Sequence, residues 1–191
     1  MVLLYKKTLL FLILIFICSS LFQPVFASKK NTVTAILTME VTSTVKPSMQ
    51  KGKPIKGARL IVINSLGNII ANVLTNSEGK AAVSITVPKD LRFRKKNMGE
   101  VTVIAVANGY NEHINFSVPI NEFDDKAARV SIPLWDIDPE RRNEPIFING
   151  SYHRFTVFEM LDYYAEKTGL VRQDIKDKSI VPPPWSSNIK Q

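Results

Sequence analysis

The strongest constraint on the fold of this chain is an alternation of apolar and other residues with a period of two. From Val33 to Val41 every second residue is apolar, and Ile36 is the one strongly apolar residue between them. Successive side chains of a β-strand point to opposite faces of a sheet, so this pattern predicts a strand with one buried face. A helix would spread the same apolar residues around its axis.

Six further segments of strand character follow before residue 135. Residues 58–64 are apolar almost throughout, which is typical of a strand covered on both faces, whereas Ala81–Val87 alternates and ends at Pro88. Turn residues such as Asn108-Gly109 separate the segments. Seven short strands in about 100 residues predict a mainly β fold, a seven-stranded antiparallel Greek-key β-sandwich. The expected strands are 32–41, 58–64, 68–75, 81–87, 100–107, 114–118 and 128–134.

Short motifs lie at the turns and strand entries of this region. They are Pro54-Ile55-Lys56-Gly57-Ala58-Arg59-Leu60-Ile61-Val62, Gly67, Thr75-Asn76-Ser77-Glu78-Gly79-Lys80, Pro88 and Gly109-Tyr110. In this order they resemble the carboxypeptidase regulatory-like domain, also called transthyretin-like or prealbumin-like, over roughly residues 32–134. The resemblance implies a transthyretin-like sandwich in a secreted bacterial protein, with a non-catalytic accessory role.

Residues 1–27 have the features of a secretory signal. Lys6 and Lys7 precede an apolar run, Leu9–Ile17, and Val25-Phe26-Ala27 offers a cleavage site. The run is shorter than the about 20 residues that span a bilayer. We therefore expect a secreted, envelope-associated protein, with residues 28–135 as the sandwich and residues 136–191 as an appendage. The alternative is a membrane anchor formed by an uncleaved N-terminal segment, the one case in which a membrane would be a partner.

Charge is distributed unevenly in a chain whose formal net charge is +8. Ser28–Met98 contains 13 Lys and Arg against 3 Asp and Glu, whereas Gly99–Gln191 contains 10 against 14. Such asymmetry is typical of a protein that contacts a polyanion. Export disfavours nucleic acid and leaves anionic wall polymers or lipid headgroups, and the alternative is a solvated loop that keeps the protein soluble. The candidate binding residues, on one long loop, are Lys89, Arg92, Arg94, Lys95 and Lys96.

The appendage is predicted to contain a turn-rich linker, an amphipathic helix and a Pro-rich tail. Thr156 and Glu159 have the spacing of a capping box, and Gly169 is a stop signal. A lone helix of this length is marginal in water, so its apolar stripe is expected to dock on the sandwich, or else on a partner. The stripe consists of Val157, Met160, Leu161, Tyr164 and Ala165.

Beyond this helix, the sequence predicts a second, shorter helix over 171–178 and then an extended end. Pro182, Pro183 and Pro184 forbid a helix there and precede Trp185. This end is expected to be a frayed terminus, with insertion into a groove of another protein as the alternative.

Composition excludes several kinds of chemistry. One cysteine and two histidines rule out a disulfide framework, a thiolate zinc cluster and a multi-histidine metal centre. The carboxylates of Asp136, Asp138 and Glu140 lack the glycine and the distant Glu of an EF-hand, so we interpret them as a solvated acidic linker. No Gly-x-Ser-x-Gly elbow occurs. We therefore expect no catalytic residues, no metal and no cofactor.

Three functional hypotheses remain. The first is a secreted non-enzymatic module that binds a protein, a peptide or an anionic wall polymer at the cell envelope. The second is a small extracellular hydrolase with its site between the sandwich and the C-terminal helix, formed by His153, Glu159, Asp136 and Asp138. The third is an accessory subunit of a surface assembly, attached through the helix and Trp185.

Overall fold

The structure, a computed structural model, describes residues 31–44, 52–92, 95–122, 127–177, 179–180 and 182–191. The expected signal segment and Arg94 lie outside these residues. Within them, no helix is both long and apolar enough to cross a membrane. The elements are β1 (Thr32–Thr44), β2 (Arg59–Asn64), β3 (Ile69–Leu74), β4 (Lys80–Pro88), β5 (Met98–Val106), β6 (His113–Asn121), β7 (Ala127–Trp135), β8 (Ile146–Ile148), α2 (Arg154–Lys167), β9 (Leu170–Arg172) and β10 (Trp185–Ile189).

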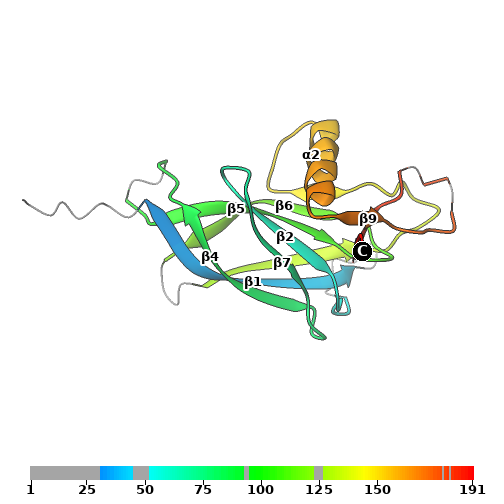
Figure 1. The fold of residues 1–191 in the computed structure, drawn as a ribbon, viewed down its shortest axis with the longest axis horizontal. Helices are drawn as coiled ribbons and strands as arrows, with labels where there is room; N and C mark the ends of the chain where they lie inside the picture. The colour runs from blue at the N-terminus through cyan, green and yellow to red at the C-terminus, as the bar shows by residue number, and fades with distance from the viewer. Residues whose placement is uncertain (1–30, 45–51, 93–94, 123–126, 178, 181) are drawn as a thin grey trace, which may run out of the picture. The chain divides into compact units, whose positions relative to one another are not determined.

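The predicted mainly β sandwich with a C-terminal helix is confirmed. One sheet has the order β4-β1-β7 and the other the order β3-β2-β5-β6-β8, so the chain changes sheets after β1, β3, β4, β6 and β7. Figure 1 shows the two layers, with β1, β4 and β7 on one side and β2, β5 and β6 on the other.

The sheets are mixed, whereas antiparallel pairing alone was expected. β1 pairs with β7 in parallel, with Leu37 opposite Ala128 and Val41 opposite Ile132, and β6 pairs with β8 in parallel. Neither pair is joined by a hairpin, and only a hairpin forces two strands to run in opposite directions. Strand alternation predicts which residues are buried, but it carries no information on strand direction.

The core between the two sheets is formed by the alternating residues of the expected strands. Val33, Leu37, Met39 and Val41 are completely buried, and Ile36, which points outward, is half exposed. Tyr110, which follows the Gly109 turn, packs against this cluster. Burial of this apolar row stabilises the pairing of β1 with both of its neighbours.

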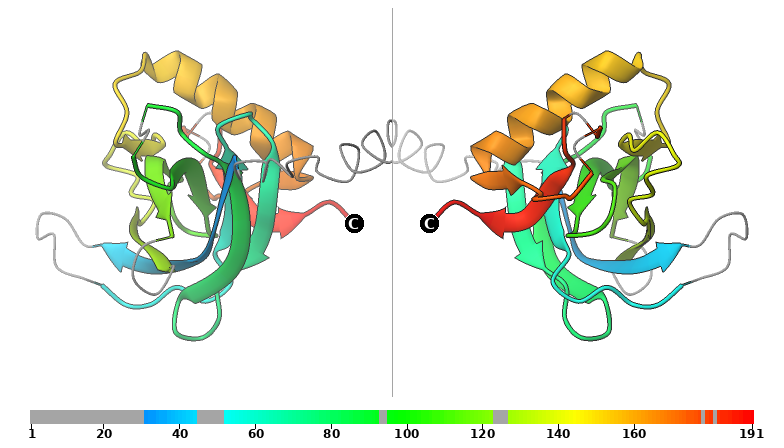
Figure 2. Two further views of the ribbon diagram at one scale, coloured as in Figure 1. Left: turned by 90° about the vertical axis from the view of Figure 1, so that its left-hand side faces the viewer. Right: turned by 90° about the vertical axis from the view of Figure 1, so that its right-hand side faces the viewer.

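The central strands of the five-stranded sheet have buried residues on both faces. In β2, Leu60 and Val62 face the other sheet, whereas Ile61 and Ile63 belong to a second apolar cluster that includes Val157 and Leu161 of α2. The continuous apolar run of β2 is explained by this double coverage. The expected docking of the helix on the sandwich is confirmed, and Figure 2 shows α2 running over the strands.

A β-bulge in β6 divides that strand between the two clusters. Ser117 has a φ of 53°, and the register with β5 shifts next to it. Residues 114, 116, 118 and 120 would share one face of a regular strand. With the bulge, Ile114 and Phe116 contact the helix cluster, while Val118 and Ile120 contact the inner core. One irregular residue therefore lets a single strand serve both cores.

The predicted capping box of Thr156 and Glu159 is wrong, because α2 starts before it. The helix begins at Arg154, two residues before Thr156, and His153 at its N-cap position makes no side-chain capping hydrogen bond. The first turn is held instead by an ion pair between Arg154 and Glu144 of the preceding loop. The predicted end is confirmed, because Gly169 has a φ of 74° and its N–H donates to the carbonyl of Glu166.

The C-terminal segment is also different from expectation. Residues 170–172 form β9 instead of a second helix, and residues 185–189 form β10, paired antiparallel with β9. Trp185 is 5% exposed, so this side chain is packed within the protein and is not part of a frayed terminus. Burial of Leu170 and Trp185 against the sheet outweighs the weak helical preference of the sequence.

Gln173 joins this segment to the sandwich through its side chain. Its amide nitrogen donates to the carbonyl oxygens of Ala107, Tyr110 and Trp185 at 2.9–3.0 Å, and its amide oxygen accepts the N–H of Gly109 at 2.8 Å. The turn between β5 and β6 is thereby tied to β10.

We expect Leu161→Ala to lower the free energy of unfolding by about 3 kcal/mol, because Leu161 is 1% exposed between α2 and the sheet. Urea denaturation monitored by tryptophan fluorescence measures this change. Glu159→Ala, on the exposed side of the same helix, is the control and should change stability by less than about 0.5 kcal/mol. Equal effects of the two substitutions would contradict the docking of α2.

Candidate binding pocket between the sandwich and the C-terminal segments

A pocket of about 420 Å³ lies where the sandwich meets α2 and the C-terminal segment. Its walls come from Glu112 just before β6, the loop 139–145, α2, β9 and residues 179, 180, 182 and 184 of the Pro-rich segment. Pockets of this size accommodate small ligands or a few residues of a chain. The pocket lies in the region that the hydrolase hypothesis indicates, but its lining is different from the residues named there.

Four arginines line this pocket: Arg141, Arg142, Arg154 and Arg172. Arg142 and Arg154 pair with the same carboxylate oxygen, Oε1 of Glu144. In the described part of the chain, Nε of Arg154 is buried and has no hydrogen-bond partner. Two guanidinium groups thus share one carboxylate, which leaves excess positive charge and a buried donor at this end of the pocket.

Arg172 has a different environment, at the other end of the pocket. Its Nη2 donates to Asp162 Oδ1 at 2.7 Å, its Nη1 donates to the carbonyl of Pro183, and its guanidinium lies 3.8 Å from the centroid of the Trp185 ring. The indole N–H of Trp185 donates to the same Asp162 oxygen at 2.7 Å. These contacts hold the C-terminal segment against α2.

Glu112 lies at the base of the pocket and is 2% exposed. Its Oε1 accepts the backbone N–H of Trp185 at 2.5 Å. Burial, which penalises the ionised form, raises the pKa of Glu112 to about 7, although the Trp185 N–H and the charge of Arg172 act in the opposite direction. Glu112 is therefore a carboxyl group that changes its charge near neutral pH.

The remaining wall of the pocket is apolar. Phe155, Phe158 and Leu161 of α2 face it, together with Ile180 and four prolines of the two bordering segments. The guanidinium of Arg154 lies 5.0 Å from the centroid of the Phe155 ring and 5.5 Å from that of Phe158. Cationic and aromatic groups are thus adjacent at one end of the cavity.

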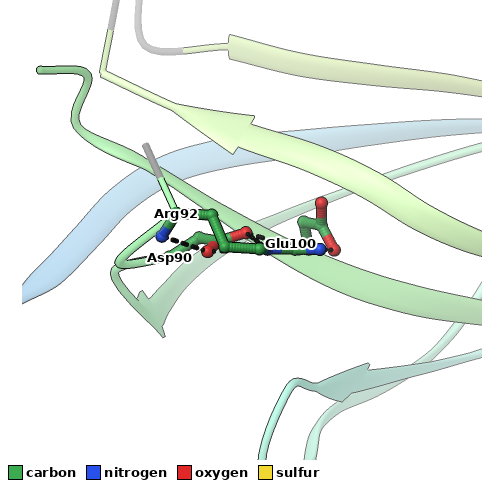
Figure 3. A network of polar contacts seen from close by, with 3 residues as sticks. All are labelled: Asp90, Arg92 and Glu100. Atoms are coloured by element: carbon green, nitrogen blue, oxygen red, sulfur yellow. Dashed lines mark hydrogen bonds and ion pairs between the residues drawn. The ribbon is translucent and has the colours of Figure 1, made fainter. Parts of the chain in front are cut away.

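The basic loop is elsewhere on the molecule, and none of its described residues lines the pocket. Figure 3 shows Arg92 between Asp90, at 2.5 Å, and Glu100, at 3.2 Å. The hydrogen bonds from Arg92 hold the pKa of Asp90 below its usual value. Lys89 Nζ donates to Asn97 at 2.9 Å, whereas Lys95 and Lys96 are exposed. The structure thus gives Arg92 and Lys89 contacts within the loop.

The residues named for a hydrolase are not brought together in this pocket. None of Asp136, Asp138, His153 and Glu159 lines it. Among the described residues, no group of three or more His, Asp and Glu is arranged to hold a metal ion. Asn143 organises the acidic linker as a turn, because its side-chain amide donates to the carbonyls of Asp138 and Arg141 and accepts the N–H of Asp138.

His113 is buried in the sandwich, with Nδ1 at 2.9 Å from the carbonyl oxygen of Pro133. Burial lowers the pKa of His113, so the ring is neutral over most of the physiological range. His113 has no part in the pocket.

Sequence reasoning missed Glu112, Arg142, Arg154 and Arg172. The run Asn111-Glu112-His113, three polar residues at the entry to an apolar strand, was the one local signal, and all three are buried. The burial of Glu112 depends on segments that follow it by about 30 to 70 residues in the chain.

No family model and no curated protein matches this chain. Among solved structures, it is similar to catechol 1,2-dioxygenase from Acinetobacter sp. ADP1, with 12% identity, a TM-score of 0.38 and coverage of 64% of this chain and 60% of that one. Catechol 1,2-dioxygenase from Pseudomonas arvilla C-1 has 14% identity, a TM-score of 0.37 and the same coverage.

The shaft pilin SpaA from Lactobacillus rhamnosus GG is also similar, with 12% identity, a TM-score of 0.31 and coverage of 56% of this chain and 52% of the pilin. The chain thus spans 60% or less of the length of each of these proteins. At these scores the similarity carries no information about the pocket. Fold and pocket together define a β-sandwich protein with an arginine-lined cavity beside its accessory helix.

We expect Glu112→Gln to stabilise the protein increasingly as the pH rises from about 5 to about 8. With its pKa raised to about 7, Glu112 keeps a proton in the folded state that the unfolded chain releases near pH 4.5. The stability due to this proton is complete below pH 4.5 and is lost as the pH rises through 7. Glutamine retains an oxygen for the Trp185 N–H and carries no charge.

The measurement is the difference in unfolding free energy between Glu112→Gln and the unsubstituted protein at several pH values. His113, whose lowered pKa acts in the opposite direction, is present in both proteins and cancels in the difference. A difference that does not change with pH would show that Glu112 ionises at its ordinary pKa.

Proposed function

We propose that the protein is a secreted, non-enzymatic β-sandwich module of the carboxypeptidase regulatory-like kind, which binds an acidic ligand at the cell envelope through the arginine-lined pocket. The observation that carries this proposal is the pairing of Arg142 and Arg154 with a single carboxylate, that of Glu144. An anionic group of a ligand would supply the second carboxylate. Charge-assisted hydrogen bonds to guanidinium groups are among the stronger polar interactions in proteins.

A binding role is supported by the hydrogen bonds of Asp162 and Glu112, the acidic groups at one end of the pocket. Asp162 accepts hydrogen bonds from Arg172 and from the Trp185 indole, and Glu112 accepts the Trp185 backbone N–H. Glu112 thus attaches the C-terminal segment to the sandwich, and Asp162 attaches it to α2. The export signal expected in residues 1–27 supports the location.

The basic loop is a second candidate contact for an anionic wall polymer. Lys95 and Lys96 are exposed, but Arg92 is engaged by Asp90 and Glu100. We therefore assign the specific contact with the acidic ligand to the pocket and a weaker, salt-sensitive contact with an anionic wall polymer to the loop.

Retention on isolated cell walls distinguishes the two contacts. We expect the double substitution Arg142→Glu and Arg154→Glu to lower retention at least about tenfold, since two charge-assisted hydrogen bonds are replaced by repulsion. Lys95→Glu with Lys96→Glu changes the net charge by the same amount and should reduce retention only at low salt. Loss of retention in the loop variant alone would transfer the proposed site to the loop. Retention that neither variant changes would overturn the proposal of an acidic ligand.

A hydrolase is the second candidate function, and Glu112 is the observation in its favour. A carboxyl group with a pKa of about 7 in a pocket is suited to general acid–base catalysis. At 2% exposure, however, Glu112 is poorly accessible to a substrate. We expect no turnover of chromogenic ester and glycoside substrates. Turnover that Glu112→Gln abolishes, in a variant shown to be folded, would establish the enzyme and contradict the binding module.

A further inference from the structure

We propose that the ligand of this pocket carries a single carboxylate next to an apolar or aromatic group, as the free C-terminus of a peptide with a hydrophobic last residue does. The inference rests on the proposed function, because it specifies the ligand class of the same pocket. It follows from three properties of the cavity: an incompletely paired guanidinium end, an apolar wall, and a second end that already contains its own carboxylates.

The guanidinium end is suited to a carboxylate. Arg154 has a buried Nε–H without a partner in the described chain, and its Nη2 shares Glu144 Oε1 with Arg142. Because Arg142 and Arg154 share this single carboxylate oxygen, a ligand oxygen that accepts hydrogen bonds from the two guanidinium groups is stabilising. The planar fork of arginine matches the two oxygens of a carboxylate.

The start of α2 adds to the positive potential at this end. Arg154 is the first residue of the helix, no acidic residue occurs in the first turn, and the N-cap residue His153 makes no side-chain capping hydrogen bond. The partial positive charge of the helix N-terminus therefore has no counter-charge on the helix itself. It acts together with the guanidinium groups on the same side of the cavity.

The apolar wall of the pocket favours a ligand with an apolar group. Phe155, Phe158, Leu161 and Ile180 border the cavity, and the two phenylalanines lie beside the guanidinium of Arg154. Inorganic phosphate, or a hydrophilic polymer, would leave this surface in contact with water. A hydrophobic side chain next to the carboxylate would cover it and gain the free energy of apolar burial.

The second end of the pocket limits the ligand to one anionic group. Asp162 lies eight residues after Arg154 on α2, a distance of about 12 Å along the helix axis. Asp162 and Glu112 both border this end, with Arg172 as their counter-charge. A second anionic group placed there would meet two carboxyl groups. A polymer with closely spaced charges is therefore disfavoured.

Isothermal titration calorimetry of the full chain tests this inference with defined probes. We expect N-acetyl-phenylalanine to bind, and N-acetyl-phenylalanine amide and N-acetyl-glycine each to bind at least about tenfold more weakly, because they lack the carboxylate and the apolar group respectively. Arg154→Lys retains the charge but loses the fork and Nε–H, and it should weaken the binding of N-acetyl-phenylalanine by a similar factor.

Two arms identify the source of the carboxylate. Tighter binding of a tripeptide ending in phenylalanine than of 3-phenylpropionate indicates a peptide C-terminus, and equal affinities indicate a free apolar acid. Both results support the inference. Equal binding of the acid and its amide, or tighter binding of inorganic phosphate than of N-acetyl-phenylalanine, would overturn it. If neither carboxylate binds but retention on cell walls still requires Arg142 and Arg154, the proposed function stands and this ligand class is wrong.

Discussion

The attachment of the C-terminal segment to the outer face of the five-stranded sheet is the interaction on which the pocket depends. Two buried polar side chains make it: Glu112 accepts the backbone N–H of Trp185, and Gln173 bonds to the turn between β5 and β6 and to Trp185. A buried polar group without a partner is unfavourable, so these bonds fix where β9 and β10 lie. The cavity walls that this segment supplies are placed as a consequence, and Glu112 acquires its raised pKa from the same burial.

The strands could be predicted because the signal for each lies within the strand itself. Alternation in residues 33–41 and 81–87, and the continuous apolar run at 58–64, gave seven strands that the structure places at nearly the same positions. The period-two pattern reflects which side of each strand is buried in the sandwich core. The Gly-Tyr turn and the helix end at Gly169 follow from equally local chemistry.

The C-terminal elements and the pocket could not be predicted in this way. The helix starts at Arg154, where an ion pair joins it to Glu144 of the preceding loop, and not at the capping-box spacing of Thr156. The helix predicted from residue 171 is replaced at its start by the pairing of β9 (Leu170–Arg172) with β10. The pocket takes side chains from five separate segments, and Arg142, Arg154 and Arg172 are unremarkable when each is considered within its own segment. The charge count indicated the basic loop as a binding site, but it could not predict that Arg92 pairs with Asp90 and Glu100.

The parallel pairing of β1 with β7 has a consequence for how the chain acquires its structure. β1 is the central strand of its sheet, yet its second neighbour lies more than 80 residues further along the chain. Closing so long a loop costs entropy before any contact compensates for it, and topologies dominated by such distant contacts fold slowly. Until β7 pairs with β1, one backbone edge of β1 is unpaired and its apolar row from Val33 to Val41 is incompletely covered. During that interval two newly made chains can aggregate along this strand.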